Sequence, residues 1–471
     1  MVNTAGTTTG VDYRVLGSTE NTPLNAGRHS SGSTDSQIEW PMGRASEMRL
    51  YLTLLGMGLA SLLPWNLFIC ASEFFHYQFA GSVYESTFQN SFSVTYTVMN
   101  FMSCLYAMVT VTRSNPNRRI VYGLIINTAV YSVGVFMPFM EKYRGTVSFY
   151  IALAQLVVSA IASGLILNSI FAIVSHFPPS NAEGMLSGQA IAGMIASFAQ
   201  LVTAYLVTPP TGSTIGSTKA EASSGLLTRT VAYFAFATTV NIMLSFAFWS
   251  ISRDPYYQAQ SKLAIGPEYL SYDSDGDGDG NSEIAFGAPP TPLPTLPDLG
   301  LFKRTFAQIS GHVYASTACF ALTLAVFPST TALVDSVSGF KLLTEWHFFL
   351  YTTGDFLGRR TAPSIPITQG STLVLLSLTR ILFVPAFFAC NVVFSVWYTW
   401  IKSDAVFLAM VLLLGYSTGL ISTRAAMIAP GLTDQPSIAG SIMAISVGTG
   451  LALGSIFSWL VRSIGCLCSP F

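Results

Sequence analysis

The amino-acid sequence predicts an all-α polytopic membrane protein with about eleven transmembrane helices, arranged as six plus five. Three observations lead to this fold class. Of the 471 residues, 51% are hydrophobic and only 10% are charged, whereas soluble domains carry roughly 25% charged residues. Apolar stretches near the ~20 residues that cross a bilayer recur along the chain. One long polar segment separates the first six stretches from the last five.

Eleven apolar stretches are long enough to serve as these helices, and polar segments separate them. Because their number is odd, the two ends of the chain are expected on opposite sides of the membrane. The stretches lie at about 48–72, 88–112, 119–139, 147–175, 185–208, 229–252, 305–328, 345–366, 370–394, 403–430 and 437–464.

Positive charge indicates which side of the membrane each connection faces. It is densest in the turn 113–119 (RSNPNRR) and at the ends of several stretches. These end residues are Arg44, Arg49, Arg253, Lys303 and Arg304. Under the positive-inside rule they are cytosolic, so the N-terminal tail and the long polar segment are expected in the cytosol. The bias is modest, because the other side carries Lys142, Arg144, Lys219 and Lys341.

Four regions follow from this pattern. Residues 1–47 form a polar tail without a signal-peptide pattern, and we expect it to be disordered and cytosolic. An N-terminal six-helix bundle is expected over 48–252 and a C-terminal five-helix bundle over 305–471. The segment between them, 253–304, is expected to be a flexible cytosolic loop with an acidic run and a proline-rich stretch.

The acidic run of this loop, residues 273–283 (DSDGDGDGNSE), resembles a calcium-binding loop. Such a loop needs a bidentate Glu at its twelfth position. Counting from Asp273 this position holds Ile284, and counting from Asp275 it holds Phe286. We therefore expect a solvated linker and no metal site. The cysteines also lack the spacing of a zinc site, and no cofactor is predicted.

The most informative residues are Asp355 and Arg359, in the run 354–359 (GDFLGR) of the eighth apolar stretch. Residues four apart lie on one face of a helix, one turn from each other. Ionisable residues are costly at membrane depth, so they usually face the interior of a helical bundle or a water-filled path. This pair therefore indicates a transporter. The alternative is an ion pair within one helix that only orients that helix.

Four further motifs lie in other apolar stretches. They are residues 62–69 (LLPWNLFI), 187–193 (SGQAIAG), 379–385 (TRILFVP) and 439–443 (AGSIM). In order and spacing, together with the charged pair, they resemble the equilibrative nucleoside transporter family, solute carrier family 29. The resemblance covers roughly residues 48–464, and the match is closer in the second half, from Phe327 onward.

The resemblance implies a major-facilitator-like bundle of two halves around a central cavity. It also implies facilitative transport of nucleosides, purine or pyrimidine, by alternating access, with nucleobases as further substrates. The implied substrate-binding residues are Leu62, Trp65, Phe348, Thr352, Asp355 and Arg359. The first two are expected on the nucleobase side of the cavity and the next three at successive inward positions of the eighth helix. The arginine is expected to assist binding or to hold the geometry of the pair.

Three more residues are candidate substrate contacts. Many relatives carry a base-binding glutamine in the fourth stretch, and Leu167 stands there in this chain, with Asn168 next to it. Adjacent helical positions point about 100° apart, so base selectivity is left open. Arg424, where an apolar residue is expected in the relatives, would repel cations, attract an anionic substrate or pair with an acidic group. Gln189 either belongs to a small-residue helix contact or faces the cavity.

Other function classes fit the sequence less well. An enzyme is not expected, because Asp355 has no second intramembrane aspartate with which to form a catalytic pair. ATP-driven transport would require a Gly-x-x-x-x-Gly-Lys-Ser/Thr loop, which the chain lacks. The net charge of −1 gives no indication of nucleic-acid binding. The alternatives left open are proton-coupled nucleoside transport and a carrier of similar fold for another small solute, such as a sugar or an organic anion.

The expected location is a lipid bilayer, with the plasma membrane as the first choice. A lysosomal or vacuolar membrane is the alternative, because residues 13–16 (YRVL) fit a tyrosine-based sorting signal. The oligomeric state is left open.

Overall fold

The computed structural model describes residues 44–85, 87–140, 143–207, 219–265, 299–393 and 395–466. Most of the predicted N-terminal tail, with its YRVL pattern, and the acidic run 273–283 lie outside the described residues. The described residues form helices and loops, with an isolated β-bridge between Val334 and Val392. The prediction of an all-α, multi-pass membrane protein is confirmed.

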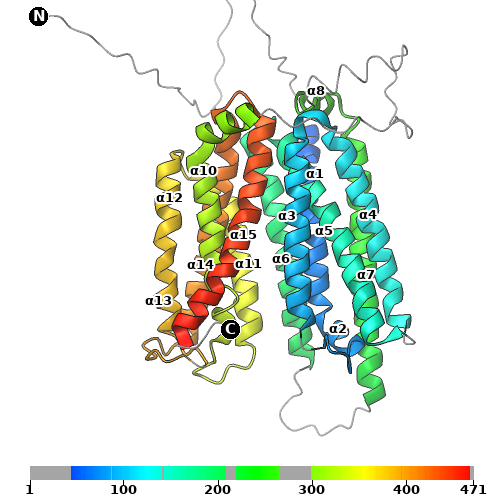
Figure 1. The fold of residues 1–471 in the computed structure, drawn as a ribbon, viewed down its shortest axis with the longest axis vertical. Coiled ribbons are helices and arrows are strands. Elements are labelled where there is room, and N and C mark those ends of the chain that lie inside the picture. The colour runs from blue at the N-terminus through cyan, green and yellow to red at the C-terminus, as the bar shows by residue number, and fades with distance from the viewer. Residues whose placement is uncertain are drawn as a thin grey trace, which may run out of the picture. The chain divides into compact units, whose positions relative to one another are not determined.

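The helices form two groups that lie next to each other in Figure 1. The first group contains α1 (Arg44–Cys70), α3 (Phe88–Val109), α4 (Pro116–Phe136), α5 (Thr146–Val174), α6 (Pro179–Val207) and α7 (Lys219–Ile251), with the short α2 (Ser72–Gln78) at one end. The second group contains α10 (Leu299–Val326), α11 (Leu343–Thr361), α12 (Gly370–Thr379), α13 (Phe383–Phe388), α14 (Asp404–Ile428) and α15 (Pro436–Cys466). Helices α6 and α11, and α5 and α15, make most of the contacts between the groups.

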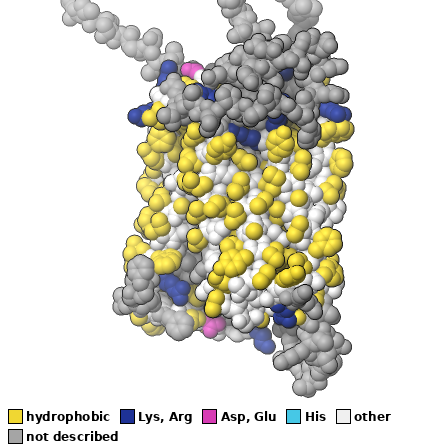
Figure 2. Space-filling view, turned by 45° about the vertical axis from the view of Figure 1, so that its right-hand side comes forward, with side chains coloured by type: hydrophobic (Ala, Val, Ile, Leu, Met, Phe, Trp, Pro, Cys, Tyr) yellow, Lys and Arg dark blue, Asp and Glu magenta, His cyan; other side chains and the backbone are white. Residues whose placement is uncertain are grey.

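Ten helical segments in the described part of the chain are long and apolar enough to cross a membrane. Helix α11 differs from them because it carries four charged residues in 19 positions, namely Glu345, Asp355, Arg359 and Arg360. It nevertheless packs lengthwise against α14 and α6, and we count it as the eleventh crossing helix. Figure 2 shows hydrophobic side chains over the flank of the helices and Lys and Arg side chains near their ends, as a bilayer requires.

Part of the predicted flexible loop 253–304 is helical, which corrects that prediction. Helix α8 (Pro255–Leu263) begins directly after α7. The side chain of Asp254 caps it by accepting hydrogen bonds from the backbone N–H groups of Tyr256 and Tyr257, and Pro255 occupies its first turn, where no N–H donor is needed. Tyr257 is buried against Phe248 of α7. A short capped helix with one buried aromatic residue is easily missed in a polar segment.

The ninth predicted stretch is shorter than expected. It ends at Phe388, and a 3-10 turn at Arg380–Leu382 divides it into α12 and α13. Arg380 is buried at this turn and donates hydrogen bonds to the hydroxyls of Thr323 and Thr418. The turn thus lies where a buried guanidinium links three elements of the second group.

The two ends of the helical bundle are named by the short helices they carry. The α8 end holds the start of α1 and the end of α11, and the α2 end holds the end of α1 and the start of α11 (Figure 1).

Candidate functional site

Helix α11 presents a row of polar and aromatic residues on one face. The row consists of Glu345, Phe348, Thr352, Asp355 and Arg359. Their spacing alternates between three and four residues, which keeps them on one side of a helix. From Glu345 to Arg359 the row advances by 14 residues, or about 21 Å at 1.5 Å per residue. The row therefore runs from the α2 end deep into the bundle.

Glycines hold α11 close against α14. Gly354 and Gly358 on α11 face Gly415 and Gly419 on α14, and each pair is spaced four residues apart. A Cβ atom at Gly358 would collide with the carbonyl oxygen of Tyr416. Small residues at this spacing allow two helix backbones to approach closely in a membrane. This contact covers the side of α11 next to the charged pair and fixes where that pair sits.

The charged pair forms as the spacing predicts. The Nε atom of Arg359 lies 3.0 Å from Oδ2 of Asp355, and the two side chains are only 5% and 12% exposed. The other carboxylate oxygen, Oδ1 of Asp355, is buried and has no hydrogen-bond partner among the described residues. An unsatisfied carboxylate oxygen is costly to bury, so the site has an acceptor ready for a ligand donor.

Helix α6 extends this polar site toward the first group of helices. Arg359 donates to Oε1 of Gln189 over 3.4 Å, and Gln189 donates to the hydroxyl of Ser61 on α1, also over 3.4 Å. About two turns before Arg359 on α11, the hydroxyl of Thr352 lies 2.8 Å from that of Ser197. Gln189 therefore contacts the charged pair directly, and α1, α6 and α11 meet at one polar centre.

Leu62 and Trp65 are half-buried on α1, and in the sequence they follow Ser61 by one and four residues. Leu62 follows Ser61, the residue that accepts from Gln189. The ring of Trp65 packs on that of Tyr96 from α3, with centroids 5.1 Å apart. The structure thus ties Trp65 to the aromatic core of the first group and leaves part of its surface exposed.

Asn168 and Arg424 contact the protein itself. Asn168 is buried, donates to the backbone oxygen of Ser441 on α15 over 3.3 Å and accepts from its hydroxyl over 3.1 Å. The guanidinium of Arg424 donates from Nε and Nη2 to the carbonyl oxygen of Ile367, at 3.0 and 2.8 Å. Both side chains therefore join helices or loops, and the structure does not bring them to the charged pair.

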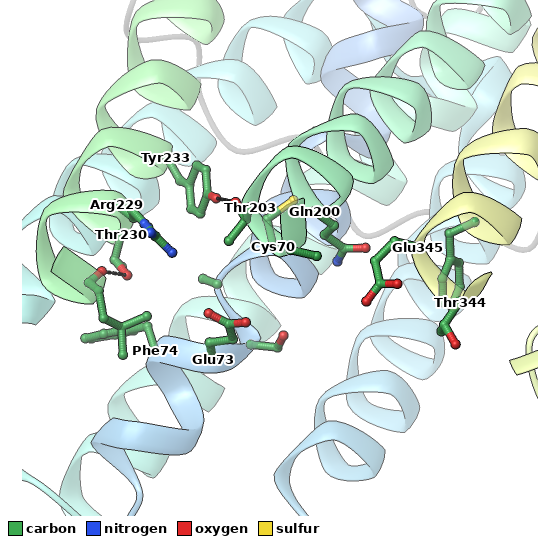
Figure 3. Close-up of a pocket in the computed structure, with 15 residues that line it drawn as sticks. Cys70, Glu73, Phe74, Gln200, Thr203, Arg229, Thr230, Tyr233, Thr344 and Glu345 are labelled. Atoms are coloured by element: carbon green, nitrogen blue, oxygen red, sulfur yellow. Dashed lines mark hydrogen bonds between the residues drawn. The ribbon is translucent and has the colours of Figure 1, made fainter. Parts of the chain in front are cut away.

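A cavity of about 200 Å³ opens at the α2 end. It lies between the first group and α11, and Phe348 belongs to its lining together with Glu345. Figure 3 shows Arg229 of α7 on one side and Glu345 of α11 on the other, with Gln200 and Thr203 of α6 between them. The row on α11 thus begins in this cavity and leads to the charged pair.

The α8 end is closed by a cluster that the sequence analysis did not identify. Glu183 of α6 accepts hydrogen bonds at one oxygen from Tyr51 of α1 (3.1 Å) and Arg360 of α11 (3.2 Å). Ser187 donates to its other oxygen over 2.6 Å. Glu183 lies before the predicted fifth stretch, which begins at 185, and Arg360 directly follows the predicted charged pair. An acidic residue two positions before a predicted span was the available signal.

A second contact closes the same end between α5 and α15. The Nε2 atom of His176 lies 2.6 Å from the hydroxyl of Ser437. Burial lowers the pKa of His176 to about 4, so the imidazole is neutral at physiological pH. A Cβ atom at Gly440 would meet the carbonyl oxygen of Phe171, which shows how closely the two helices approach here.

Within the ranges that the structure describes, no three His, Cys, Asp or Glu side chains are grouped so that they could hold a metal ion.

Comparison with known proteins identifies relatives along nearly the whole chain. Equilibrative nucleoside transporter 3 of Rattus norvegicus is 22% identical over 440 residues, covering 88% of this chain and 88% of that protein. Equilibrative nucleoside transporter 2 of Homo sapiens is 25% identical over 458 residues, covering 87% of this chain and 95% of that protein. These relatives match the family that the sequence motifs resemble.

Solved structures share the fold at low sequence identity. A bacterial homologue of the iron transporter ferroportin, in an outward-facing state, has a TM-score of 0.54 at 11% identity, covering 88% of this chain and 95% of that one. The human organic anion transporter MFSD10 has a TM-score of 0.50 at 16% identity, covering 90% and 96%. These likenesses support the fold alone.

The family model described as "Nucleoside transporter" matches residues 153–463, from α5 to near the end of α15. This match covers most of the chain and includes the charged pair on α11. The chain is therefore a membrane transporter rather than an enzyme, and it belongs to the nucleoside transporter family.

Proposed function

We propose that this protein carries nucleosides across a membrane down their concentration gradient by alternating access, and that Asp355 is the centre of its substrate site. The observation that carries the proposal is the free Oδ1 atom of Asp355, buried at the meeting point of three helices. A buried acceptor beside a paired arginine suits a neutral ligand with several hydroxyl groups, such as a ribose.

Each neighbouring group has a role in this proposal. The carboxylate of Asp355 accepts hydrogen bonds from the ribose hydroxyls, while Arg359 keeps the carboxylate paired when the site is empty. Gln189 and Thr352 offer further polar contacts, since both already lie in the polar network of this centre. Trp65 offers a partly exposed indole face for the nucleobase. Phe348 and Leu62 are proposed as apolar contacts around it.

The contacts between the two groups of helices support alternating access. At the α8 end the groups are joined by the Glu183–Arg360 ion pair and by His176 with Ser437. At the α2 end a cavity lies between the first group and α11. We propose that residues 48–252 and 305–471 act as the two moving halves, and that substrate leaves when the contacts at the α8 end open.

The orientation and the membrane are part of the proposal. Arg44 and Arg49 belong to the start of α1, and Arg253 lies between α7 and α8, so all three lie at the α8 end. The positive-inside rule makes that end cytosolic. We propose the plasma membrane as the location. Microscopy of the tagged full chain, with and without Tyr13→Ala, checks this, since lysosomal or vacuolar signal that depends on Tyr13 would replace the plasma membrane assignment.

The test is uptake of radiolabelled adenosine, uridine and hypoxanthine into proteoliposomes holding the purified protein, with and without a pH gradient. Saturable nucleoside uptake that stops at equal concentrations on both sides is the expected result. Accumulation above equilibrium that requires the pH gradient would replace facilitative by proton-coupled transport. Absence of nucleoside uptake in both conditions would contradict the proposed substrate, and hypoxanthine uptake alone would reassign it to nucleobases.

A further inference from the structure

The cavity at the α2 end carries charged side chains that the proposed central site does not use. Glu73 of α2, Arg229 of α7 and Glu345 of α11 all belong to its lining, together with Gln200 and Tyr233. Figure 3 shows the carboxyl groups and the guanidinium directed toward the space between the helices. Three ionisable side chains therefore line one small cavity.

Glu345 is the member of this set with an unmet bonding requirement. Its Oε2 atom is buried and has no hydrogen-bond partner among the described residues. No ion pair joins Glu345 to Arg229 within the ranges that the structure describes. A shielded carboxylate oxygen without a donor costs free energy, and a ligand that supplies hydroxyl donors removes that cost.

We infer that this cavity is an outer substrate subsite, which holds a neutral nucleoside before it reaches Asp355. The inference rests on the proposed function and extends it to a second position on the same helix. Glu345 accepts hydrogen bonds from the ribose hydroxyls, and Arg229 with Gln200 donates to acceptor atoms of the base. Phe348 provides an aromatic surface at the inner wall.

The size and charge of the cavity define the ligand class. Its volume of about 200 Å³ is below the ~300 Å³ at which typical enclosing ligand pockets begin, so the subsite holds a nucleoside partly and leaves it hydrated. Two carboxylates against one guanidinium give the lining a net negative charge. A nucleoside 5′-monophosphate is therefore excluded by like-charge repulsion, whereas an uncharged nucleoside is accepted.

The row on α11 connects the two positions. Glu345 and Asp355 lie ten residues apart on one helix face, which separates them by about 15 Å. Phe348 and Thr352 lie between them at successive turns of that face. A nucleoside released by Glu345 thus meets an aromatic ring, a hydroxyl and then the inner carboxylate without leaving α11.

The first experiment measures adenosine uptake by Glu345→Gln in proteoliposomes. Glu85→Gln is the matched control, because Glu85 lies at the same end but outside the cavity lining. We expect the KM of Glu345→Gln to rise at least 5-fold, with a smaller change in maximal rate, and the control to stay within 2-fold of the native protein. An unchanged KM in a variant with native thermal stability would overturn the outer subsite.

The second experiment separates this inference from the proposed function by direct binding of radiolabelled adenosine to the purified full chain. If the native protein did not bind adenosine, the proposed function itself would be contradicted. If the native protein binds, we expect Asp355→Ala to retain weaker, saturable binding that adenosine 5′-monophosphate does not displace. Addition of Glu345→Gln should then remove this binding. The subsite would be overturned if Asp355→Ala bound no adenosine, or if its binding were unchanged when Glu345→Gln was added.

A charge exchange tests the competing role of Glu345 as half of a gating ion pair. Under the subsite assignment, Arg229→Glu combined with Glu345→Arg transports no better than either single variant, because the acceptor for the ribose is gone from α11. Recovery of uptake in the double variant would show that the two charges act on each other, and would overturn the subsite.

Discussion

The two ends of the helical bundle differ in how a buried carboxylate is hydrogen-bonded. At the α8 end, Glu183 is 2% exposed and accepts hydrogen bonds from residues of α1, α6 and α11. At the α2 end, Glu345 keeps a buried oxygen without any donor from the described residues. A carboxylate whose two oxygens both accept hydrogen bonds joins the helices that supply the donors. A carboxylate with an oxygen that lacks a donor is open to a ligand. Under the proposed function, this difference distinguishes the closed end from the end that receives substrate.

Asp355 lies between these ends and shares a property with each. One of its oxygens is paired with Arg359, as at the closed end, and the other is free, as at the cavity. We expect Asp355→Ala to lower nucleoside uptake by two orders of magnitude or more. The reason is that it removes the ligand acceptor and leaves a buried arginine unpaired, a change that costs about 3–5 kcal/mol in other buried pairs.

The measurement is initial-rate uptake normalised to the amount of protein in the membrane. Asp355→Asn keeps the shape of the side chain and is the informative companion, because it retains one acceptor oxygen and should recover part of the rate. Native uptake by Asp355→Ala would remove this residue from the substrate site.

The position of α11 depends on its glycine contact with α14, and a single methyl group tests it. Gly358→Ala places a Cβ atom against the carbonyl oxygen of Tyr416, and overpacking of this kind costs about 1–3 kcal/mol. We expect a lower Tm in detergent and at least 10-fold slower uptake, since the charged pair is displaced with the helix.

Gly431→Ala is the control for this prediction. A Cβ atom at Gly431 would meet nothing within 4 Å, so both Tm and uptake should stay near native values. Equal effects of the two substitutions would mean that the close α11–α14 contact does not position the site.

Opening the closed end directly is the next test. Glu183→Gln keeps the size of the side chain but removes its charge, and so weakens its bonds to Tyr51 and Arg360. We expect uptake to fall about 5-fold. Cys70, which lines the cavity at the other end, should react more slowly with a membrane-impermeant maleimide, because the population shifts away from the state open at the α2 end. Mass spectrometry identifies the labelled residue, with Cys70→Ala as the blank.

Arg360→Ala sharpens the same comparison. Its side chain is 59% exposed, so its pairing with Glu183 is screened by solvent. We expect it to slow Cys70 labelling less than Glu183→Gln does. The reverse order would assign the closing contact to the arginine and not to the buried carboxylate.

The smallest effect concerns His176 and pH. Burial lowers its pKa from 6.5 to about 4, so the unfolded chain binds the proton more readily than the folded one between these values. Its contribution to the free energy of unfolding is therefore complete above pH 6.5 and is lost as the pH falls toward 4. We expect the Tm to drop by a few degrees more between pH 7.5 and 4.5 in the native protein than in His176→Gln. An identical pH dependence in both would remove this histidine from the closed end.

Much of the fold and the centre of the site were predictable because they depend on local spacing. Low charge and repeated apolar stretches predicted the crossing helices, and a four-residue separation placed Asp355 and Arg359 on one helix face. The pair forms in the structure as this spacing requires. Helix α8 was missed because its stability comes from a cap and one buried tyrosine, and neither produces an apolar period.

The partners of the pair were not predictable from spacing. Gln189 lies 170 positions from Arg359, and its flanking glycines suit a packing contact and a site equally well. Asn168 was a candidate substrate contact, and the structure joins it to Ser441, 273 positions away. Buried polar side chains usually have a hydrogen-bond partner, but a single sequence does not say which helix will supply it.

By itself, the sequence determined that the chain crosses a membrane many times and that one helix carries a charged pair at membrane depth. Both are consequences of hydrophobicity and helical period, which act within a few turns. Only the tertiary structure decided that Glu183 closes one end, that Glu345 is left unsatisfied at the other, and that Asn168 and Arg424 join parts of the protein. Those outcomes depend on which helices lie side by side, and packing between distant segments fixes that arrangement.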